Sequence, residues 1–189
     1  MSLLSERILK EVGPTAPFYA VLDGARSSSV APWAQATRAP VWCLYEGKLD
    51  KALEEVAPRL IRLGRGHGFT EELLAEGFQE HWGIVFASDA SSKDLRRHLR
   101  RFFLARTEDD RRLLFRYYDP RVLSLYLPAL NAEELKAFFG PISMFITNDQ
   151  HDGDPLAFET YRRRGTELVQ KRIVIEPPAL AEPGSQKTG

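Results

Sequence analysis

The residues that most constrain the fold are five consecutive apolar ones, Phe18 to Leu22, bounded by Pro17 and by Asp23-Gly24. A strand with one face in water alternates apolar and polar residues, because successive side chains point to opposite faces of the sheet. A continuous apolar run of strand length instead indicates a strand that is buried on both faces. We therefore expect a sheet that is covered on both sides.

Strand-sized apolar segments alternate with helical patterns along the rest of the chain. Further strands are predicted at residues 41–45, 60–63, 83–87, 142–147 and 172–175, and helices at 5–12, around 33–36, 48–56, 70–82, 92–103, 120–127 and 132–139. Residues 104–117 are predicted to form a hairpin that turns at 108–110. The alternation predicts an α/β fold, with a mixed, partly parallel sheet flanked by helices in a single domain.

Length and composition set the domain organisation and the compartment. The 189 residues suit one domain, predicted over 1–176, while the tail 177–189 is rich in Pro, Ala, Gly and Ser and is predicted to be disordered. Cys43 is the only cysteine, so no internal disulfide can form, as a reducing compartment permits. The N-terminus lacks the features of a signal peptide, and no apolar run approaches the roughly 18 residues of a membrane span. We expect a cytoplasmic protein that does not bind a membrane.

The net charge is zero, but residues 93–121 carry ten basic and five acidic residues. Four arginines lie opposite the apolar stripe of the predicted helix 92–103, namely Arg96, Arg97, Arg100 and Arg101. Most charge runs of this kind are solvated helix faces. As a functional site, this face fits an acidic protein partner. A nucleic-acid-binding module that uses residues 93–121 is an alternative, although the molecule is neutral and aromatic residues are not interleaved on the basic face.

Two loops resemble ligand-binding sites. The first is rich in glycine but has the wrong glycine spacing, and the second resembles a calcium loop but lacks acidic residues at two ligand positions. Residues 64–68 read GxGxG instead of the dinucleotide pattern GxGxxG, and Glu71 and Glu72 place negative charge where phosphates would bind. The loop that starts at Asn148 resembles a calcium loop, but Asn148 and Gln150 occupy positions that calcium loops give to acidic residues. We predict turns at both places, with no cofactor and no metal.

The sequence contains no local catalytic constellation. The four histidines lie apart in the sequence, and neither an HExxH nor a GxSxG pattern is present. We therefore predict that no residue is catalytic. An enzyme whose site is assembled only in space, from His67, Asp89 or His98, is the second alternative.

Several segments together resemble one protein family. They are residues 18–26 (FYAVLDGAR), 43–47 (CLYEG), 57–61 (APRLI), 82–85 (WGIV), 95–101 (LRRHLRR), 114–122 (LFRYYDPRV) and 138–141 (FFGP). In order and spacing they resemble the domain-of-unknown-function 4123 family (DUF4123) over about residues 16–147. The most specific stretch is FRYYDPRV.

The resemblance implies a function and roles for the motif residues. Members of this family are adaptor chaperones of bacterial type VI secretion, which hold a toxic effector in the cytoplasm and help to load it onto the VgrG-type spike. It implies a protein partner, no nucleic acid and no enzymatic activity. Within the motifs, Asp23, Arg26, Arg116 and Asp119 are expected to be structural, as ion-paired or capping groups. Family members often carry a larger C-terminal lobe than this chain has after residue 147.

Overall fold

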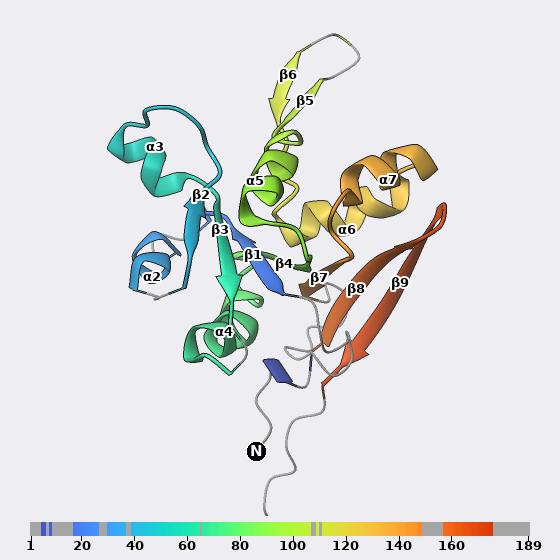
Figure 1. Cartoon of the computed structure of the whole chain (residues 1–189), viewed down its shortest axis with the longest axis horizontal. Coiled ribbons are helices and arrows are strands. Elements are labelled where there is room, and N and C mark those ends of the chain that lie inside the picture. The colour runs from blue at the N-terminus through green and yellow to red at the C-terminus, as the bar shows by residue number, and fades with distance from the viewer. Residues whose placement is uncertain are drawn as a thin grey trace, which may run out of the picture.

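The centre of the molecule is one seven-stranded sheet (Figure 1). Its strands are β1 (Phe18–Leu22), β2 (Val41–Cys43), β3 (Arg59–Leu63), β4 (Gly83–Ala87), β7 (Met144–Asn148), β8 (Ala157–Arg164) and β9 (Glu167–Val174). They lie in the order β2-β3-β1-β4-β7-β8-β9, and every neighbouring pair is antiparallel. The prediction of a partly parallel sheet is therefore wrong.

The physical reason is that two helical connections skip a neighbouring strand. The register makes both β1 and β2 antiparallel to β3, so β1 and β2 run in the same direction with β3 between them. In the same way β3 and β4 run in the same direction, with β1 between them. Strands that are joined through a helix run in the same direction in these two units, but they are not neighbours. The sequence pattern does not reveal that an opposed strand separates each pair.

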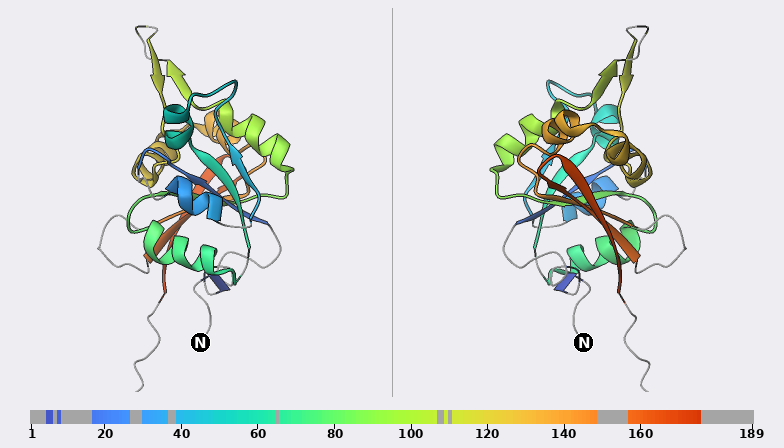
Figure 2. Two further views of the ribbon diagram at one scale, coloured as in Figure 1. Left: turned by 90° about the vertical axis from the view of Figure 1, so that its left-hand side faces the viewer. Right: turned by 90° about the vertical axis from the view of Figure 1, so that its right-hand side faces the viewer.

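Helices connect the strands, and a small hairpin stands apart from the sheet. The helices are α2 (Val30–Ala36), α3 (Lys51–Val56), α4 (Gly68–Glu72), α5 (Ser92–Arg100), α6 (Pro120–Ala129) and α7 (Ala132–Phe139), and α4 continues as the π-helical turn η1 (Leu73–Gly77). The hairpin consists of β5 (Leu104–Arg106) and β6 (Arg112–Leu114), as predicted. It projects from the body in both views of Figure 2. Among the described residues, no helix is long and apolar enough to cross a membrane.

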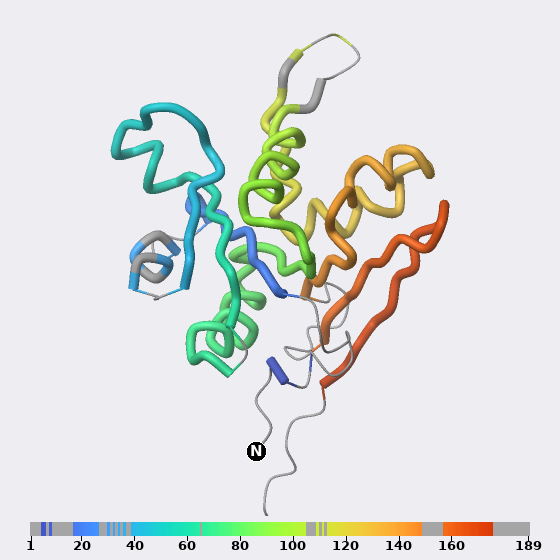
Figure 3. Tube along the Cα trace, viewed as in Figure 1, coloured from blue at the N-terminus to red at the C-terminus, as the bar shows by residue number. Residues whose placement is uncertain are grey.

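The computed structural model describes residues 5, 6, 8, 17–26, 30–36, 39–64, 66–106, 109, 111–148 and 157–175, which are traced in Figure 3. Most of the predicted calcium-like loop and the predicted tail 177–189 lie outside them. The hairpin of β8 and β9 was only partly predicted, since the sequence pattern indicates a strand at 172–175 alone.

The centre of the sheet is buried on both faces, as the apolar run in β1 predicts. Phe18, Ala20 and Leu22 contribute to a core cluster with α2, α4 and η1. Tyr19 and Val21 contribute to a second cluster with α5, α6 and α7. All five residues of β1 are buried. The fold is thus three layers, with helices on each side of an antiparallel sheet.

Capping side chains fix where four of the helices begin, and at the start of α3 the Asp50 side chain accepts a hydrogen bond from the backbone N–H of Leu53. Ser91 accepts a hydrogen bond from the backbone N–H of Asp94 at the start of α5. Asp119 caps α6 with Pro120 at its first position, and Asn131 forms a reciprocal capping box with Glu134 at the start of α7. These caps satisfy backbone donors that would otherwise lack partners. The starts of α5, α6 and α7 agree with the sequence prediction, whereas α3 begins at Lys51 and not at the predicted residue 48.

Replacing Leu99 with alanine tests which side of α5 faces the core. Leu99 is buried in the second cluster, so Leu99→Ala should lower the free energy of unfolding by about 2–5 kcal/mol through loss of buried surface and a residual cavity. Leu125 on α6 is 79% exposed, so Leu125→Ala should change it by less than about 0.5 kcal/mol. Urea unfolding measures both. Equal effects would contradict the assignment of the buried face.

Candidate functional site

Exposed apolar side chains gather at one end of the molecule. Seven large hydrophobic residues are exposed among the described residues, and five of them lie on α3 and on the β5–β6 hairpin, namely Leu53, Val56, Leu104, Leu113 and Leu114. These five are between 40 and 59% exposed. Both α3 and the hairpin lie at the upper end in Figures 1 and 2. We call these five residues the hairpin-end surface. Large apolar side chains that are exposed on neighbouring parts of one end of a molecule are candidates for an interaction site.

The hairpin exposes leucines on both of its faces. Leu104 pairs with Leu114 and Ala105 pairs with Leu113, and residues that oppose each other in a ladder share a face. Leu104 and Leu114 therefore lie on one face, and Leu113 lies on the other. An isolated two-stranded hairpin is at best marginally stable in water. This one therefore depends on its attachment to the body.

Aromatic contacts anchor the base of the hairpin. The backbone N–H of Phe115 donates a 2.8 Å hydrogen bond to the carbonyl of Phe103, which extends the pairing below the two strands. The Phe103 ring stacks on Tyr117 with 5.7 Å between centroids and meets Tyr45 edge-on at 5.8 Å. Phe115 packs against Tyr126 with centroids 4.6 Å apart. The base of the hairpin is thus part of the second core cluster, while its leucines stand outside it.

An ion pair between a buried carboxylate and a half-buried arginine connects the central strand to the hairpin. Asp23, which directly follows β1, is buried and accepts a 3.0 Å hydrogen bond from the backbone N–H of Ala25. Its second carboxylate oxygen accepts a hydrogen bond from Arg116, just beyond the hairpin base. This hydrogen bond raises the pKa of the Arg116 guanidinium, which therefore stays charged. The pair fixes the hairpin base to the end of β1.

Gly24 brings the same turn against α3. A Cβ atom at this position would lie 2.6 Å from the carbonyl oxygen of Glu55 and 2.8 Å from that of Ala57. No larger residue fits without moving the end of α3. Asp23 and Gly24 therefore position the two parts of the hairpin-end surface relative to one strand, although no residue of α3 is itself buried.

The remaining motif residues also make internal contacts. Arg26 donates from Nε to the carbonyl of Glu80 at 3.1 Å. Asp119 accepts hydrogen bonds from the backbone, Nε and Nη2 of Arg121. Burial by itself would raise the pKa of the Asp119 carboxyl, but the hydrogen bonds and charge of Arg121 outweigh burial and lower this pKa below its ordinary value. Burial and the charge of Asp23 raise the pKa of the Tyr118 phenol, which keeps it protonated.

The four arginines of α5 do not form one exposed patch. Arg100 is half-buried and donates to the carbonyl oxygens of Cys43, Leu44 and Tyr45 and to the carboxylate of Glu46. Arg100 thus holds the segment that leads from β2 towards α3. Arg96 is half-buried. Arg97 is exposed and forms an ion pair with Asp94, and Arg101 is exposed beside the Phe102 ring. Only Arg97 and Arg101 are exposed as the predicted partner-binding face requires.

The three residues of the alternative enzyme site are not brought together. His67 precedes α4, which packs in the first core cluster, whereas His98 lies on α5 in the second, so the sheet separates them. His98 is buried and its Nε2 lies 2.8 Å from the carbonyl oxygen of Phe138. Asp89 is exposed after β4. Within the described part of the chain, no group of three or more His, Cys, Asp or Glu residues could hold a metal ion.

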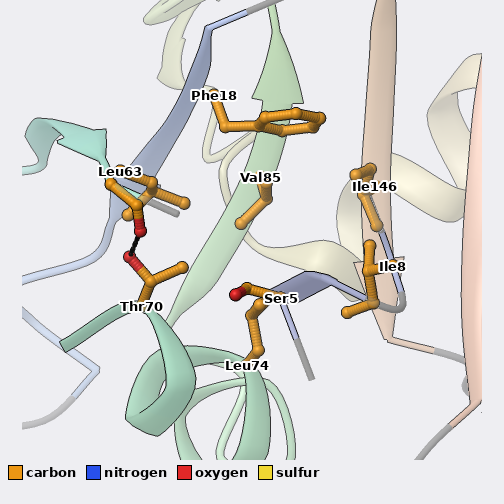
Figure 4. A pocket seen from close by; sticks show the side chains of 9 residues that line it. Ser5, Ile8, Phe18, Leu63, Thr70, Leu74, Val85 and Ile146 are labelled. Carbon is orange, nitrogen blue, oxygen red and sulfur yellow. Dashed lines mark hydrogen bonds between the residues drawn. The ribbon is translucent and has the colours of Figure 1, made fainter. Parts of the chain in front are cut away.

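Two hollows lie near the glycine-rich turn, and neither resembles a catalytic site. The first is an apolar cavity of about 20 Å³ among Ser5, Ile8, Phe18 and their neighbours (Figure 4). Its volume admits about one water molecule. The second is an open hollow of about 290 Å³ whose charged or titratable lining residues are Arg62 and His67. The described residues that line it include no carboxylate, hydroxyl or thiol side chain.

The glycine-rich turn itself has a packing role. A Cβ atom at Gly64 would lie 2.4 Å from the imidazole of His67. The carbonyl of Gly64 accepts a 2.7 Å hydrogen bond from the Thr70 hydroxyl. These contacts account for a glycine at this position without a bound phosphate.

Comparison with known proteins identifies the family. The model of a family described as a domain of unknown function, DUF4123, matches residues 18–137. The chain belongs to the DUF4123 family. The match begins at β1 and ends within α7, so it includes the hairpin-end surface and the Asp23–Arg116 pair, while β7, β8 and β9 lie beyond it. No curated protein and no solved structure matches the chain.

Sequence reasoning missed the hairpin-end surface of this DUF4123 protein, although one signal was present. Leu113 and Leu114 are adjacent in a predicted hairpin, and adjacent residues of a strand point to opposite faces. A two-stranded hairpin can cover both leucines only if something packs on each of its faces. The sequence contains no comparable signal for the exposure of Leu53 and Val56, because the apolar pattern of α3 resembles that of a helix with one buried side.

Arg100 should contribute far more to the stability of the DUF4123 domain than Arg97. Arg100→Ala removes hydrogen bonds to three carbonyl groups, and should lower the free energy of unfolding by about 1–3 kcal/mol. Arg97→Ala removes one exposed ion pair and should lower it by less than about 1 kcal/mol. Urea unfolding of both variants measures the difference. A larger loss for Arg97→Ala would contradict the internal role of Arg100.

His98 should make the stability depend on pH. Burial lowers the pKa of His98 from its ordinary value of 6.5, so below about pH 6.5 the unfolded chain binds a proton that the folded chain does not. The free energy of unfolding should therefore fall as the pH drops from 6.5 towards 5. The fall should be smaller in His98→Gln than in the parent protein, and His67→Gln, which replaces an exposed histidine on the other side of the sheet, is the control. Urea unfolding at several pH values measures it, and equal slopes in all three proteins would refute the assignment.

Proposed function

We propose that this protein is a non-catalytic, cytoplasmic adaptor that binds a type VI secretion effector and helps to load it onto a VgrG-type spike. The role is the one implied by the resemblance to DUF4123 adaptors. The observation that carries it is the hairpin-end surface, where leucines stand in solvent on a firmly anchored hairpin. An effector is proposed to cover this surface.

The hairpin-end surface has the properties that partner binding requires. Covering the exposed half of a leucine side chain contributes on the order of 1 kcal/mol, and the surface offers four leucines and a valine. Because aromatic contacts and the Asp23–Arg116 pair hold the hairpin base, little further ordering is needed there on binding. The exposed guanidinium group of Arg101, directly after α5, favours a partner with acidic groups around the contact.

The internal pairing of the basic segment favours a protein partner over nucleic acid. Residues 93–121 contain ten basic residues. Among the side chains that the structure describes, five of them form ion pairs, namely Arg97 with Asp94, Arg100 with Glu46, Arg111 with Asp109, Arg116 with Asp23 and Arg121 with Asp119. Paired arginines offer a phosphate backbone less uncompensated charge than the sequence suggests.

Polar substitutions on the hairpin should weaken effector binding selectively. The protein is co-expressed with the effector candidate encoded beside its gene, and the effector retained on the tagged protein is measured. Leu104→Ser with Leu114→Ser should reduce retention by about tenfold, because two partly desolvated leucines are lost from the contact. Leu125→Ser, an exposed leucine on α6, should leave it unchanged. Thermal melts of both variants should match the parent protein, since all three residues are exposed.

Two outcomes would contradict separate parts of the proposal. If the effector is not retained by the parent protein, and is equally soluble without it, the adaptor role fails. If the parent protein retains the effector and the double variant does so equally well, the role stands but the hairpin-end surface is not the binding site.

A further inference from the structure

The open hollow beside the glycine-rich turn combines apolar walls with two polar side chains. Its volume of about 290 Å³ is close to the lower limit of ordinary small-molecule sites, about 300–1,000 Å³. Such sites are mostly apolar and contain a few polar groups that orient the ligand. We call this cavity the Arg62–His67 hollow. Its apolar walls are Ala39, Pro40, Leu63 and Phe69, and its polar side chains are those of Arg62 and His67.

The end of strand β3 positions Arg62 at the hollow. The backbone N–H of Arg62 donates a 3.1 Å hydrogen bond to the carbonyl of Pro40, which directly precedes β2. Proline has no N–H with which to return this hydrogen bond, so the pairing of β2 with β3 ends here. Arg62 is exposed between two buried residues of β3. Its guanidinium has no ion-pair or hydrogen-bond partner among the described residues, and it is therefore available to a ligand.

A closed turn holds the imidazole of His67 against Gly64. A Cβ atom at Gly64 would lie 2.4 Å from Cδ2 and 2.9 Å from Nε2 of this ring, so glycine leaves room for the imidazole. Two hydrogen bonds from Thr70 close the turn, one from its hydroxyl to the Gly64 carbonyl at 2.7 Å and one from its N–H to the His67 carbonyl at 2.8 Å. The imidazole itself is exposed and makes no hydrogen bond to a described residue. In either protonation state it has an N–H group that a ligand can accept from.

We propose that the Arg62–His67 hollow binds a small organic carboxylate with an apolar body, such as a single aromatic ring. The planar guanidinium of Arg62 matches a carboxylate with two parallel hydrogen bonds, and His67 donates a third. The apolar body of the ligand lies against Pro40, Leu63 and Phe69, from which it displaces water. Because the closed turn already holds His67 in place, little ordering of this side chain is needed on binding.

A carboxylate fits the hollow better than a phosphate. Among the described lining residues, Arg62 is the one side chain with a permanent positive charge, and it balances the charge of one carboxylate. Glu71 and Glu72 lie on α4, which begins directly after His67. Coulomb energy is proportional to charge, so these glutamates repel a phosphate dianion about twice as strongly as a carboxylate.

A small ligand fits the hollow better than the surface of a protein. Of the large hydrophobic residues that are exposed in the described part of the chain, none lines the hollow, whereas the centre of a protein interface is apolar. The hollow adjoins the end of β3 that leads to α4, and the hairpin-end surface lies at the other end of the molecule (Figure 1). The inference therefore goes beyond the proposed adaptor function and does not depend on it.

The experiment is an NMR titration of the full-length, ¹⁵N-labelled protein with phenylacetate and three comparison compounds. Phenylacetate should shift the amide signals of Arg62, Leu63 and His67. It should bind at least about tenfold more tightly than phenylacetamide, which lacks the charge, and than acetate, which lacks the apolar body. It should also bind more tightly than phenyl phosphate at about pH 7.5, where the phosphate is a dianion.

Substitutions assign the binding to the two polar side chains. Arg62→Gln should weaken phenylacetate binding by about tenfold, because the paired hydrogen bonds to the carboxylate are lost. His67→Ala should weaken it by about threefold. Arg164→Gln removes an exposed arginine from β8 and should leave the binding unchanged. Thermal melts of the three variants should match the parent protein, since each replaces an exposed side chain.

The inference fails if phenylacetamide or acetate binds as tightly as phenylacetate, or if phenyl phosphate binds more tightly. It also fails if the shifted amides lie away from the hollow, if Arg62→Gln keeps the affinity of the parent protein, or if tens of millimolar phenylacetate shift no signal. Effector retention is measured with hairpin variants and involves no residue of the hollow, so failure of one proposal leaves the other standing.

Discussion

The structure depends on a central strand that has no face in solvent. β1 is paired on both edges, with β3 and β4, and its side chains enter a separate core cluster on each face. The chain must leave this strand through a polar turn that is still buried. A buried carboxylate is stable only when hydrogen bonds and opposite charge compensate the loss of water. Asp23 has both, from Ala25 and Arg116. Because Asp23 requires a compensating charge, Arg116 and the adjoining hairpin base lie beside the end of β1.

The same strand shows what the sequence could predict about the fold. Burial on both faces is a property of consecutive residues, so the run Phe18 to Leu22 was sufficient to predict it. The relative direction of neighbouring strands depends on which strand is inserted between two others, and that choice is made by tertiary packing. Gly83 illustrates such packing, because a Cβ there would lie 2.0 Å from the carbonyl oxygen of Val21. No local pattern around Gly83 indicates that it must adjoin β1.

In the candidate site, too, contacts between residues close in sequence could be predicted, whereas contacts between distant residues could not. The capping role of Asp119 could be inferred from the Asp-Pro pair that opens α6, because a helix cap involves residues close in sequence. The role of Arg100 could not, since its partners lie 54 to 57 residues away and the arginines beside it have a similar sequence context. For this reason the sequence placed Arg100 on the solvent-facing side of the helix together with the other three arginines. The helical pattern indicates which side of α5 faces the core. It does not identify the loop that packs against Arg100.

The hairpin-end surface is held from two directions, and this affects how a partner can bind. Asp23 and Gly24 fix the hairpin base and the end of α3 to β1, while Arg100 fixes the segment before α3 to the helix that precedes the hairpin. Two elements fixed in this way present their apolar groups at a set separation, which lowers the entropic cost of association. Leu104 and Leu114 share one face of the hairpin and Leu113 lies on the other. A flat partner surface can therefore cover only one face, and burial of all three leucines requires a partner that encloses the hairpin.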